Sequence, residues 1–212
     1  GDLEAFNKGA AVAGPDDVIL FLGDYADRGP EGVEVIEATK KLLESHGDRV
    51  VALQGNHELY TKNGRPTFSP CTLIDEARKK RGSWKSFRPL FESFVDQLSI
   101  AAILPGALLF VHGGVHRSIT SEEDLVSPDD QIKTELLWSD PGKHPGEASS
   151  MRGIGTVFGN DITGTVTSAL GVHAVIRSHE PRKAMNGPYI EHEGRYITMS
   201  STSVYGGRPF IL

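Results

Sequence analysis

The 212-residue chain is poor in cysteine, with Cys71 alone, and it contains three methionines and two tryptophans. Because a single thiol has no partner within the chain, disulfide-stapled folds are excluded, and the composition fits a reducing compartment, which we take to be the cytoplasm. No apolar run approaches the length that crosses a bilayer, and no signal peptide is visible, so we expect no membrane partner. The chain opens on Gly1-Asp2, directly at a motif, and we therefore expect a further strand upstream of residue 1.

Positive charge is also in deficit. The 22 Lys and Arg residues stand against 28 Asp and Glu residues, which gives a formal net charge of -6. A general nucleic-acid or anionic-membrane role is therefore disfavoured, although local basic groups can still bind phosphate. Internal repeats, low-complexity tracts and linkers are absent too. With a hydrophobic share of 38%, which is ample for a core, the chain is predicted to form a single domain over residues 1–212.

What the chain does contain is two apolar runs that end in polar clusters bounded by glycine. Residues 17–24 (DVILFLGD) lead into GDYADRG at 23–29, and residues 48–56 (DRVVALQGN) lead into GNHE at 55–58. Runs rich in Val, Leu and Ile that stop at glycine predict buried parallel strands, and the helical pattern of 31–46 between them predicts a βαβ unit. Functional side chains collect at the carboxyl ends of such strands.

The remaining sequence predicts further helices and hairpins. We expect a helix over 83–98 and a hairpin over 99–112, then a short helix that is capped by Ser127-Pro128 and ends near Trp138. Residues 139–153 have a loop composition, 174–180 read as a strand, and 189–200 read as a closing hairpin. The predicted fold class is α/β, with two mixed β-sheets packed face to face, flanked by helices, and an active site at the carboxyl ends of strands.

Polar residues just past strand ends form a candidate metal site. Two carboxylates, one amide and two imidazoles suit divalent ions of borderline hardness, such as Mn, Fe or Zn. Paired ions are a common device for stabilising the oxygens of a phosphoryl displacement. The candidate ligands are Asp2, Asp24, Asn56, His112 and His179.

Other charged side chains near these ligands suggest phosphate chemistry. Arg28, Arg152 and Arg177 are candidates to bind phosphate oxygens, since a guanidinium pairs with them in a bidentate manner. His57, beside Asn56, is placed to protonate a leaving oxygen, and Asp27 is a natural partner for its imidazole.

The blocks GDYADRG, GNHE and VHGG (111–114) resemble the signature of the phosphoprotein phosphatases. These enzymes are calcineurin-like metallophosphoesterases and include the major serine/threonine phosphatases. The resemblance continues, in family order, through LLWSDP (136–141), MRGIGTVFG (151–159), IRSHE (176–180) and ITMSSTSVYGG (197–207). It implies the metallophosphoesterase sandwich fold over nearly the whole chain.

The resemblance also implies roles for single residues. Asp24 matches the aspartate that bridges two metals, and Asp2 matches a ligand of the first metal. Asn56, His112 and His179 match ligands of the second metal. His57 matches the general acid and Asp27 the carboxylate that orients it. The residues that match substrate-binding positions are Arg28, Arg152, Tyr205 and Asn56.

The chain departs from the family at Glu4. The first block normally reads GDxHG, whereas here it reads GDLEA, so that Glu4 stands at the position of a metal-binding histidine. A carboxylate there makes a harder site that favours Mn or Mg over Zn; alternatively, Glu4 points away and the first site is weak or empty. We expect two divalent ions as cofactors, Mn first, with Fe, Zn or Mg as alternatives.

The resulting functional hypothesis is a serine/threonine protein phosphatase in which a water between two metals attacks the phosphate in one step. The partner is then a phosphoprotein or a small phosphoester. Two other functions remain open: hydrolysis of dinucleoside polyphosphates or other small phosphoesters, and an inactive scaffold with the same fold.

Structural roles are the alternative for several of these residues. Asp24 and Asp27 are ordinary turn residues by composition, and Arg177 is as well suited to a structural salt bridge as to catalysis. We expect Glu58 to be structural. The two glycines after His112 suggest a close approach of the backbone to something bound.

Overall fold

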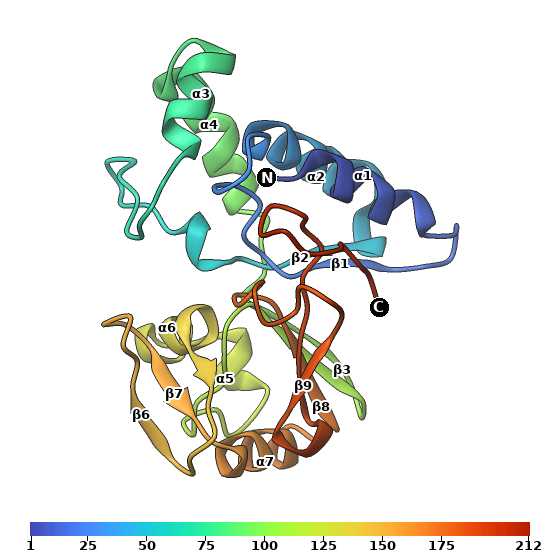
Figure 1. The fold of residues 1–212 in the computed structure, drawn as a ribbon, viewed down its shortest axis with the longest axis vertical. Coiled ribbons are helices and arrows are strands. Elements are labelled where there is room, and N and C mark those ends of the chain that lie inside the picture. Colours follow the sequence, from blue (N-terminus) through green and yellow to red (C-terminus); the bar gives the residue numbers. More distant parts are fainter. The chain divides into compact units, whose positions relative to one another are not determined.

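The computed structural model describes residues 1–212, which fold into two compact units (Figure 1). The first unit comprises Gly1–Ser99 together with Ser201–Leu212, and the second unit comprises Ile100–Ser200. A single domain over 1–212 stays a prediction. None of the helices has both the length and the apolar character required to cross a membrane.

The first unit contains the predicted βαβ segment. Strand β1 (Ile19–Phe21) pairs in parallel with β2 (Val50–Ala52), and α2 (Gly32–His46) connects them. Helix α2 ends at Gly47, whose φ of 54° is in the left-handed region that favours glycine. The parallel pair and the predicted helix over 31–46 are confirmed, and both strands end at the same edge, immediately before GDYADRG and GNHE.

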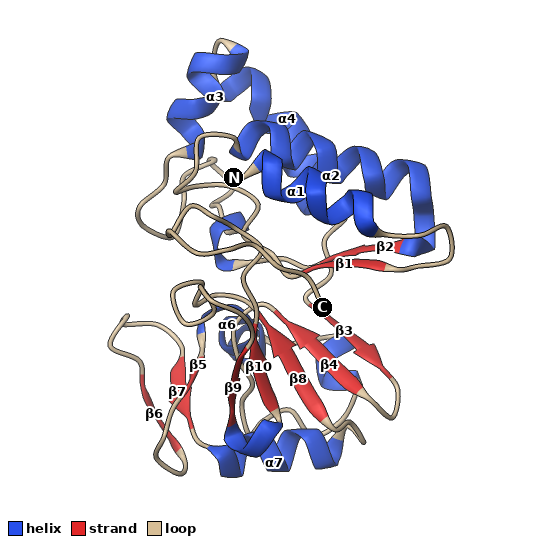
Figure 2. Ribbon diagram, turned by 45° about the vertical axis from the view of Figure 1, so that its right-hand side comes forward, coloured by secondary structure: helices blue, strands red, loops and turns tan.

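Three more helices complete this unit, and a short 3-10 turn carries GNHE (Figure 2). These elements are α1 (Leu3–Val12), η2 (Asn56–Glu58), α3 (Leu73–Arg81) and α4 (Trp84–Val95), with a second 3-10 turn, η1 (Gly47–Arg49), before β2. The helix predicted over 83–98 is α4, in which Pro89 lies inside the helix. The aromatic stripe of α4 is buried against α2 and α3; the core includes Tyr25, Val33, Ile36, Leu73, Phe87, Phe91 and Phe94.

The second unit is built around a five-stranded mixed sheet. Its strands follow the order β3 (Ala101–Leu104), β4 (Leu108–Val111), β8 (Ala174–Arg177), β10 (Tyr196–Thr198), β9 (Tyr189–Glu191). The antiparallel pairs β3–β4 and β9–β10 confirm the two predicted hairpins. Because β4 and β8 are parallel, their carboxyl ends share one edge of the sheet, and His112 and His179 follow there.

A smaller mixed sheet of three strands lies in the same unit. Its order is β5 (Asp140–Pro141), β7 (Thr156–Phe158), β6 (Glu147–Ser149). The prediction of a loop over 139–153 is therefore wrong for β5 and β6, since strands this short have no visible period and exist only by pairing with β7. The molecule has three sheets where two were predicted, while the α/β class with mixed sheets and helices is confirmed.

One hydrophobic core joins both sheets of the second unit to its helices. The helical elements are α5 (Glu123–Val126), α6 (Asp130–Trp138), α7 (Asn160–Ala169) and the 3-10 turn η3 (His192–Gly194). Helix α6 is capped by Asp129, whose carboxylate accepts from the amide of Ile132 at 2.7 Å, and not by Ser127-Pro128 as predicted. The buried core includes Leu109, Val111, Leu136, Phe158, Val166, Val175 and Tyr196.

Candidate active site

The first unit holds a buried pair of His57 and Asp27. The Nδ1 atom of His57 lies 2.7 Å from Oδ2 of Asp27, and the imidazole packs on Phe68 with 4.3 Å between ring centroids. Burial alone would lower the pKa of His57, but the carboxylates of Asp24 and Asp27 outweigh it and raise that pKa. With Nδ1 held by a carboxylate, Nε2 is the nitrogen that is left to exchange a proton with a ligand.

Asp27 is held by a second set of contacts. Its Oδ1 atom accepts from the amides of Thr72 at 2.5 Å and Leu73 at 2.9 Å, at the start of α3. Although burial opposes it, these bonds and the bond from His57 lower the pKa of Asp27. The same carboxylate therefore anchors a helix and orients an imidazole.

Asp27 makes part of the free energy of unfolding depend on pH. Because its folded pKa lies below the ordinary 3.8, its contribution is present above pH 3.8 and is lost as the pH falls through the folded pKa. We expect Asp27→Asn to lower the free energy of unfolding by about 1–3 kcal/mol at pH 7. Urea unfolding from pH 7 down to pH 2.5, with chelator in every sample, should show the two proteins converging below pH 3.8; a constant difference over this range would contradict the assignment.

The GDYADRG loop has an unusual backbone. Asp24, Asp27 and Arg28 have φ values of 61°, 66° and 61°, in the left-handed region where residues other than glycine are strained. Such conformations persist only where the surroundings hold them. The buried Glu58 holds the backbone at Asp24, since its carboxylate accepts from the amides of Asp24 at 2.9 Å and Tyr25 at 3.1 Å.

Glu58 also closes the GNHE turn on itself, because it accepts from the amide of Gly55 at 2.8 Å. Burial and the charge of Asp24 raise its pKa to about 8, against the lowering effect of these amides. In addition, the amide of His57 donates to Oδ1 of Asp24 at 3.0 Å. The structure therefore brings the two blocks together, with Asp24 beside the turn that carries Asn56 and His57.

The two N-terminal candidate ligands, Asp2 and Glu4, have their hydrogen bonds and ion pairs outside this turn. Asp2 caps α1 by accepting from Ala5 at 3.0 Å, and its other oxygen accepts from the amide and hydroxyl of Ser203, both at 2.7 Å. Burial opposes the effect of these bonds, which lower the pKa of Asp2. The side chain of Glu4 is 78% exposed and pairs with Lys8 at 2.5 Å.

The exposure of Glu4 leads to a direct prediction. We expect Glu4→Gln to leave the number of bound metal ions and the activity unchanged, because the carboxylate points to solvent and pairs with a lysine on its own helix. Elemental analysis of the purified variant, compared with Asp24→Asn as the positive control, tests this. Loss of one metal equivalent in Glu4→Gln would restore Glu4 as a ligand.

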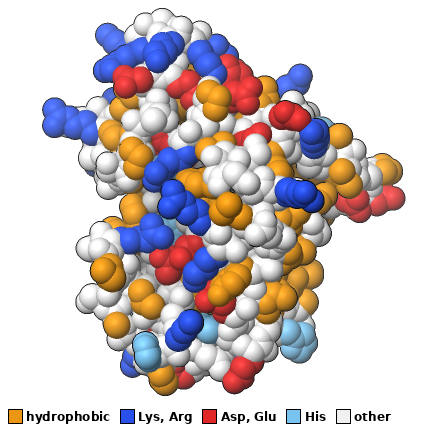
Figure 3. All heavy atoms as spheres, in the orientation of Figure 1, with side chains coloured by type: hydrophobic (Ala, Val, Ile, Leu, Met, Phe, Trp, Pro, Cys, Tyr) orange, Lys and Arg blue, Asp and Glu red, His pale blue; other side chains and the backbone are white.

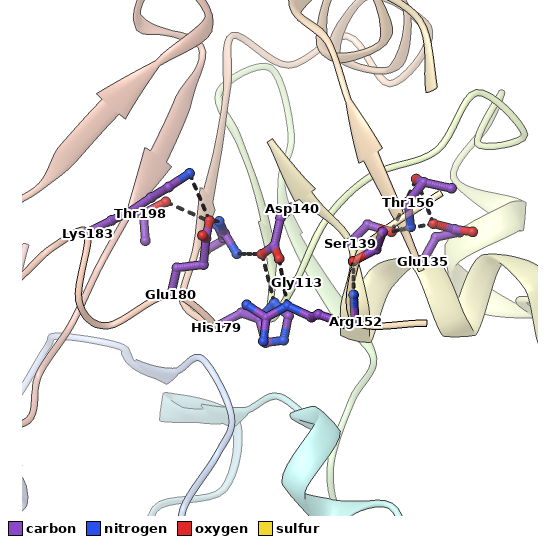
Figure 4. A network of polar contacts seen from close by, with 12 residues as sticks. Gly113, Glu135, Ser139, Asp140, Arg152, Thr156, His179, Glu180, Lys183 and Thr198 are labelled. Carbon is purple, nitrogen blue, oxygen red and sulfur yellow. Dashed lines mark hydrogen bonds and ion pairs between the residues drawn. The ribbon is translucent and has the colours of Figure 1, made fainter. Parts of the chain in front are cut away.

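In the second unit, a buried carboxylate organises the candidate residues (Figure 4). One oxygen of Asp140 accepts from Arg177 at 2.9 Å and from Nδ1 of His179 at 3.0 Å, and the other accepts from Nε of Arg152 at 2.9 Å. Burial would raise the pKa of Asp140, but the bond from His179 and the two guanidinium charges hold it well below its ordinary value. Asp140 is therefore an anion that fixes three side chains.

The two arginines differ in their access to solvent. Arg177 is fully buried and also bonds Thr198 at 3.0 Å and Glu180, so that, of the two roles left open for it, the structure shows the salt bridge. The side chain of Arg152 remains 44% exposed although its Nε is held by Asp140. Part of the Arg152 guanidinium is thus available to a ligand.

His179 has the chemistry of a metal ligand. Its Nε2 atom is buried and has no hydrogen-bond partner, while Asp140 occupies Nδ1. A carboxylate on one ring nitrogen and an open lone pair on the other is the arrangement of metal-binding histidines. The buried ring of His112 lies with its centroid 5.2 Å from that of His179, so that two imidazoles are paired in this unit.

Within neither unit do three His, Cys, Asp or Glu side chains group as a ready-made metal site. Each unit instead carries part of the predicted set: Asp24 and Asn56 in the first, and the two imidazoles in the second. These donors suit borderline divalent ions, and the orphaned nitrogen of His179 fits such an ion.

The glycines after His112 pack closely against the protein itself. A side chain on Gly113 would come within 2.7 Å of the backbone of Leu137, and one on Gly114 within 2.6 Å of Phe158 and Ser139. The two glycines thus allow a close approach to Leu137 of α6 and to Phe158 of β7. Something bound near these glycines stays a prediction.

The remaining predicted substrate residues belong to the first unit. Arg28 is exposed, as a phosphate-binding side chain must be, and Tyr205 is half-buried in the C-terminal segment. Sequence reasoning missed Asp140, whereas the structural role that it predicted for Glu58 is confirmed by the backbone amides that Glu58 binds. The signal for Asp140 was its place in LLWSDP, where a carboxylate follows an apolar helix.

Comparisons with known proteins identify the family. Calcineurin-like phosphoesterases match the chain over residues 1–183, which extends across both units. A putative serine/threonine-protein phosphatase from Caenorhabditis elegans is 31% identical over 220 residues, which cover 98% of this chain and 46% of that protein. The chain therefore spans about half the length of this curated relative.

Solved structures show the same fold. A protein serine/threonine phosphatase from Saccharomyces cerevisiae superimposes with a TM-score of 0.77 at 27% identity, over 92% of this chain and 62% of that one. A cold-active protein tyrosine phosphatase gives a TM-score of 0.59 at 16% identity, over 90% of this chain and 60% of that one. At that identity the second likeness concerns the fold alone.

Proposed function

The chain belongs to the calcineurin-like phosphoesterase family, and from this premise we propose that it hydrolyses phosphoserine and phosphothreonine in proteins with two divalent metal ions. Phosphoester hydrolysis is the chemistry of the family, whose members typically depend on two metals. The protein substrate, the resident metal and the residues in the reaction are our proposal. Mn is the ion we favour.

The observation that carries the proposal is the buried pair of His57 and Asp27. Asp27 holds Nδ1 of the imidazole, and, against the effect of burial, the carboxylates of Asp24 and Asp27 raise the pKa of His57, which favours the protonated ring. His57 then donates that proton from Nε2 to the oxygen of the departing serine or threonine. An alkoxide leaves poorly without such a donor, so this pair suits an alkyl phosphomonoester.

The proposed metal ligands are Asp24 and Asn56, with Asp2 as a further candidate, and the imidazoles of His112 and His179. When bound, such ions activate water and neutralise phosphate charge. The chain itself prepares this site. Glu58 holds the strained backbone of Asp24, and Asp140 holds the ring of His179 with Nε2 open.

Two arginines would bind the phosphate oxygens. Arg28 is exposed, and Arg152 keeps part of its guanidinium exposed while Asp140 anchors its Nε. An anchored guanidinium loses little conformational freedom on binding, which favours a tight clamp. The C. elegans and S. cerevisiae relatives are named as serine/threonine phosphatases, which supports serine and threonine as the phosphorylated residues.

The test is a substrate panel under matched Mn. We expect turnover of phosphoserine and phosphothreonine peptides, little turnover of a phosphotyrosine peptide, and activity that chelator abolishes and Mn restores. Preference for a dinucleoside tetraphosphate would replace the proposal by small-molecule hydrolysis. No turnover of any substrate, p-nitrophenyl phosphate included, would indicate a scaffold.

A further inference from the structure

The basic residues of this acidic chain are concentrated in one segment. Residues 61–92 contain eight Lys or Arg against three Asp or Glu, a formal charge of +5 in a chain of total charge -6. The segment comprises a turn at 61–65, helix α3 and helix α4, all in the first unit. Figure 3 shows several Lys and Arg side chains, with some Asp and Glu among them, in the region of α3 and α4.

Half of these cations have structural partners. Lys80 pairs with Glu34 at 2.6 Å, and Arg81 bonds Glu37, which ties α3 to α2. Arg78 and Arg88 pair with acidic residues on their own helices. These four charges are therefore already neutralised.

The other four cations are exposed and form no ion pair, although the chain has an excess of acidic residues. They are Lys62, Arg65, Lys79 and Lys85. We call this set the basic arm. Unpaired charge of one sign that is collected from three neighbouring pieces of chain attracts a partner of the opposite sign.

The backbone that carries the basic arm is firmly held. The carbonyl of Lys62 accepts from Arg88 at 2.6 Å, and the carbonyl of Gly64 accepts from the indole of Trp84 at 3.2 Å, so that the turn is bonded to α4. The hydroxyl of Ser86 bonds the last carbonyl of α3, that of Arg81, at 2.7 Å. The cations are thus displayed on a fixed frame, which reduces the entropy that binding costs.

Two contacts connect the segment that carries the basic arm to the His57–Asp27 pair, which contains the proposed proton donor. Helix α3 begins at Leu73, whose amide bonds Asp27, and the loop between the turn and α3 contains Phe68, which packs on the ring of His57. A helix of nine residues is about 13 Å long, so its last turn lies about that distance from Asp27. An extended peptide covers the same distance in about four residues.

We propose that the basic arm binds acidic residues about three to five positions away from the phosphorylated residue of a protein substrate. The proposal rests on the proposed function and adds a substrate class, phosphosites with an acidic flank. Lysines on an exposed frame favour carboxylates by charge rather than by shape, so the preference should be for Asp and Glu alike and should weaken with salt.

The test uses the full chain with Mn and pairs of phosphothreonine peptides that differ only in Asp or Gln at positions three to five from the phosphothreonine. We expect a KM about tenfold lower for the acidic peptides at low salt, and an equal KM at 0.5 M salt. Lys79→Glu/Lys85→Glu should abolish the preference without changing kcat for p-nitrophenyl phosphate. Lys62→Glu/Arg65→Glu is an independent second pair.

The matched control is Lys41→Glu/Lys143→Glu, which changes the net charge equally at two exposed lysines outside the arm. An equal loss of preference in this control, or no preference in the parent protein, would overturn the inference and leave the proposed function intact. If nothing is hydrolysed, the proposed function fails. Fluorescence anisotropy with an unphosphorylated acidic peptide then still measures the affinity of the basic arm for acidic residues. Tighter binding of a single-stranded RNA or of phosphatidylserine vesicles than of that peptide would also overturn the inference.

Discussion

Replacing His57 by alanine should lower kcat/KM for a phosphothreonine peptide by about 10²–10⁴-fold, the usual contribution of a placed proton donor. The loss should be much smaller for p-nitrophenyl phosphate, because nitrophenolate leaves without being protonated. The amount of bound metal should not change, since the imidazole is committed to Asp27 rather than to the candidate ligands. Steady-state kinetics on both substrates and elemental analysis check the three statements.

The control for this experiment is His173→Ala, because His173 is an exposed histidine of the second unit. Its kinetics should equal those of the parent protein. Equal losses on both substrates in His57→Ala would mean that His57 does not protonate the leaving group. Lost metal in that variant would instead make His57 part of the metal site.

The largest effect on stability is expected at Asp140. Asp140→Leu should lower the free energy of unfolding by about 3–5 kcal/mol, because the fully buried Arg177 loses one of its two carboxylate partners and keeps only Glu180. The double variant Asp140→Leu/Arg177→Met should recover a large part of this loss, since it also removes the buried charge that has lost a partner. Urea unfolding of the parent, the two single variants and the double variant gives the coupling energy.

Asp140 also has a measurable link to the metal site. Because it holds Nδ1 of His179, Asp140→Asn should weaken metal binding by about 10- to 100-fold even where folding is retained. Competition with a chelator of known affinity reports this at constant pH. A stable Asp140→Leu protein, within 1 kcal/mol of the parent, would show that the buried ion pair is not what holds this part of the fold.

Local pattern alone predicted much of the first unit. The apolar runs before Gly23 and Gly55 and the helical period of 31–46 require only neighbouring residues to be recognised, and β1, α2 and β2 follow them. The hairpins of the second unit were visible for the same reason. Short polar strands were not, because β5 and β6 are defined by hydrogen bonds to β7 and not by their own composition.

Within the candidate site, the sequence by itself determined which kinds of side chain stand at the ends of apolar strands: carboxylates, an amide, imidazoles and guanidinium groups. Only the tertiary structure decided how they are held. The bond of Asp140 to His179 spans 39 residues, and that of Asp27 to His57 spans 30. Contacts over such separations depend on chain folding, which no local period encodes. The left-handed backbone at Asp24 likewise depends on Glu58, 34 residues away, because a strained conformation lasts only where distant groups stabilise it.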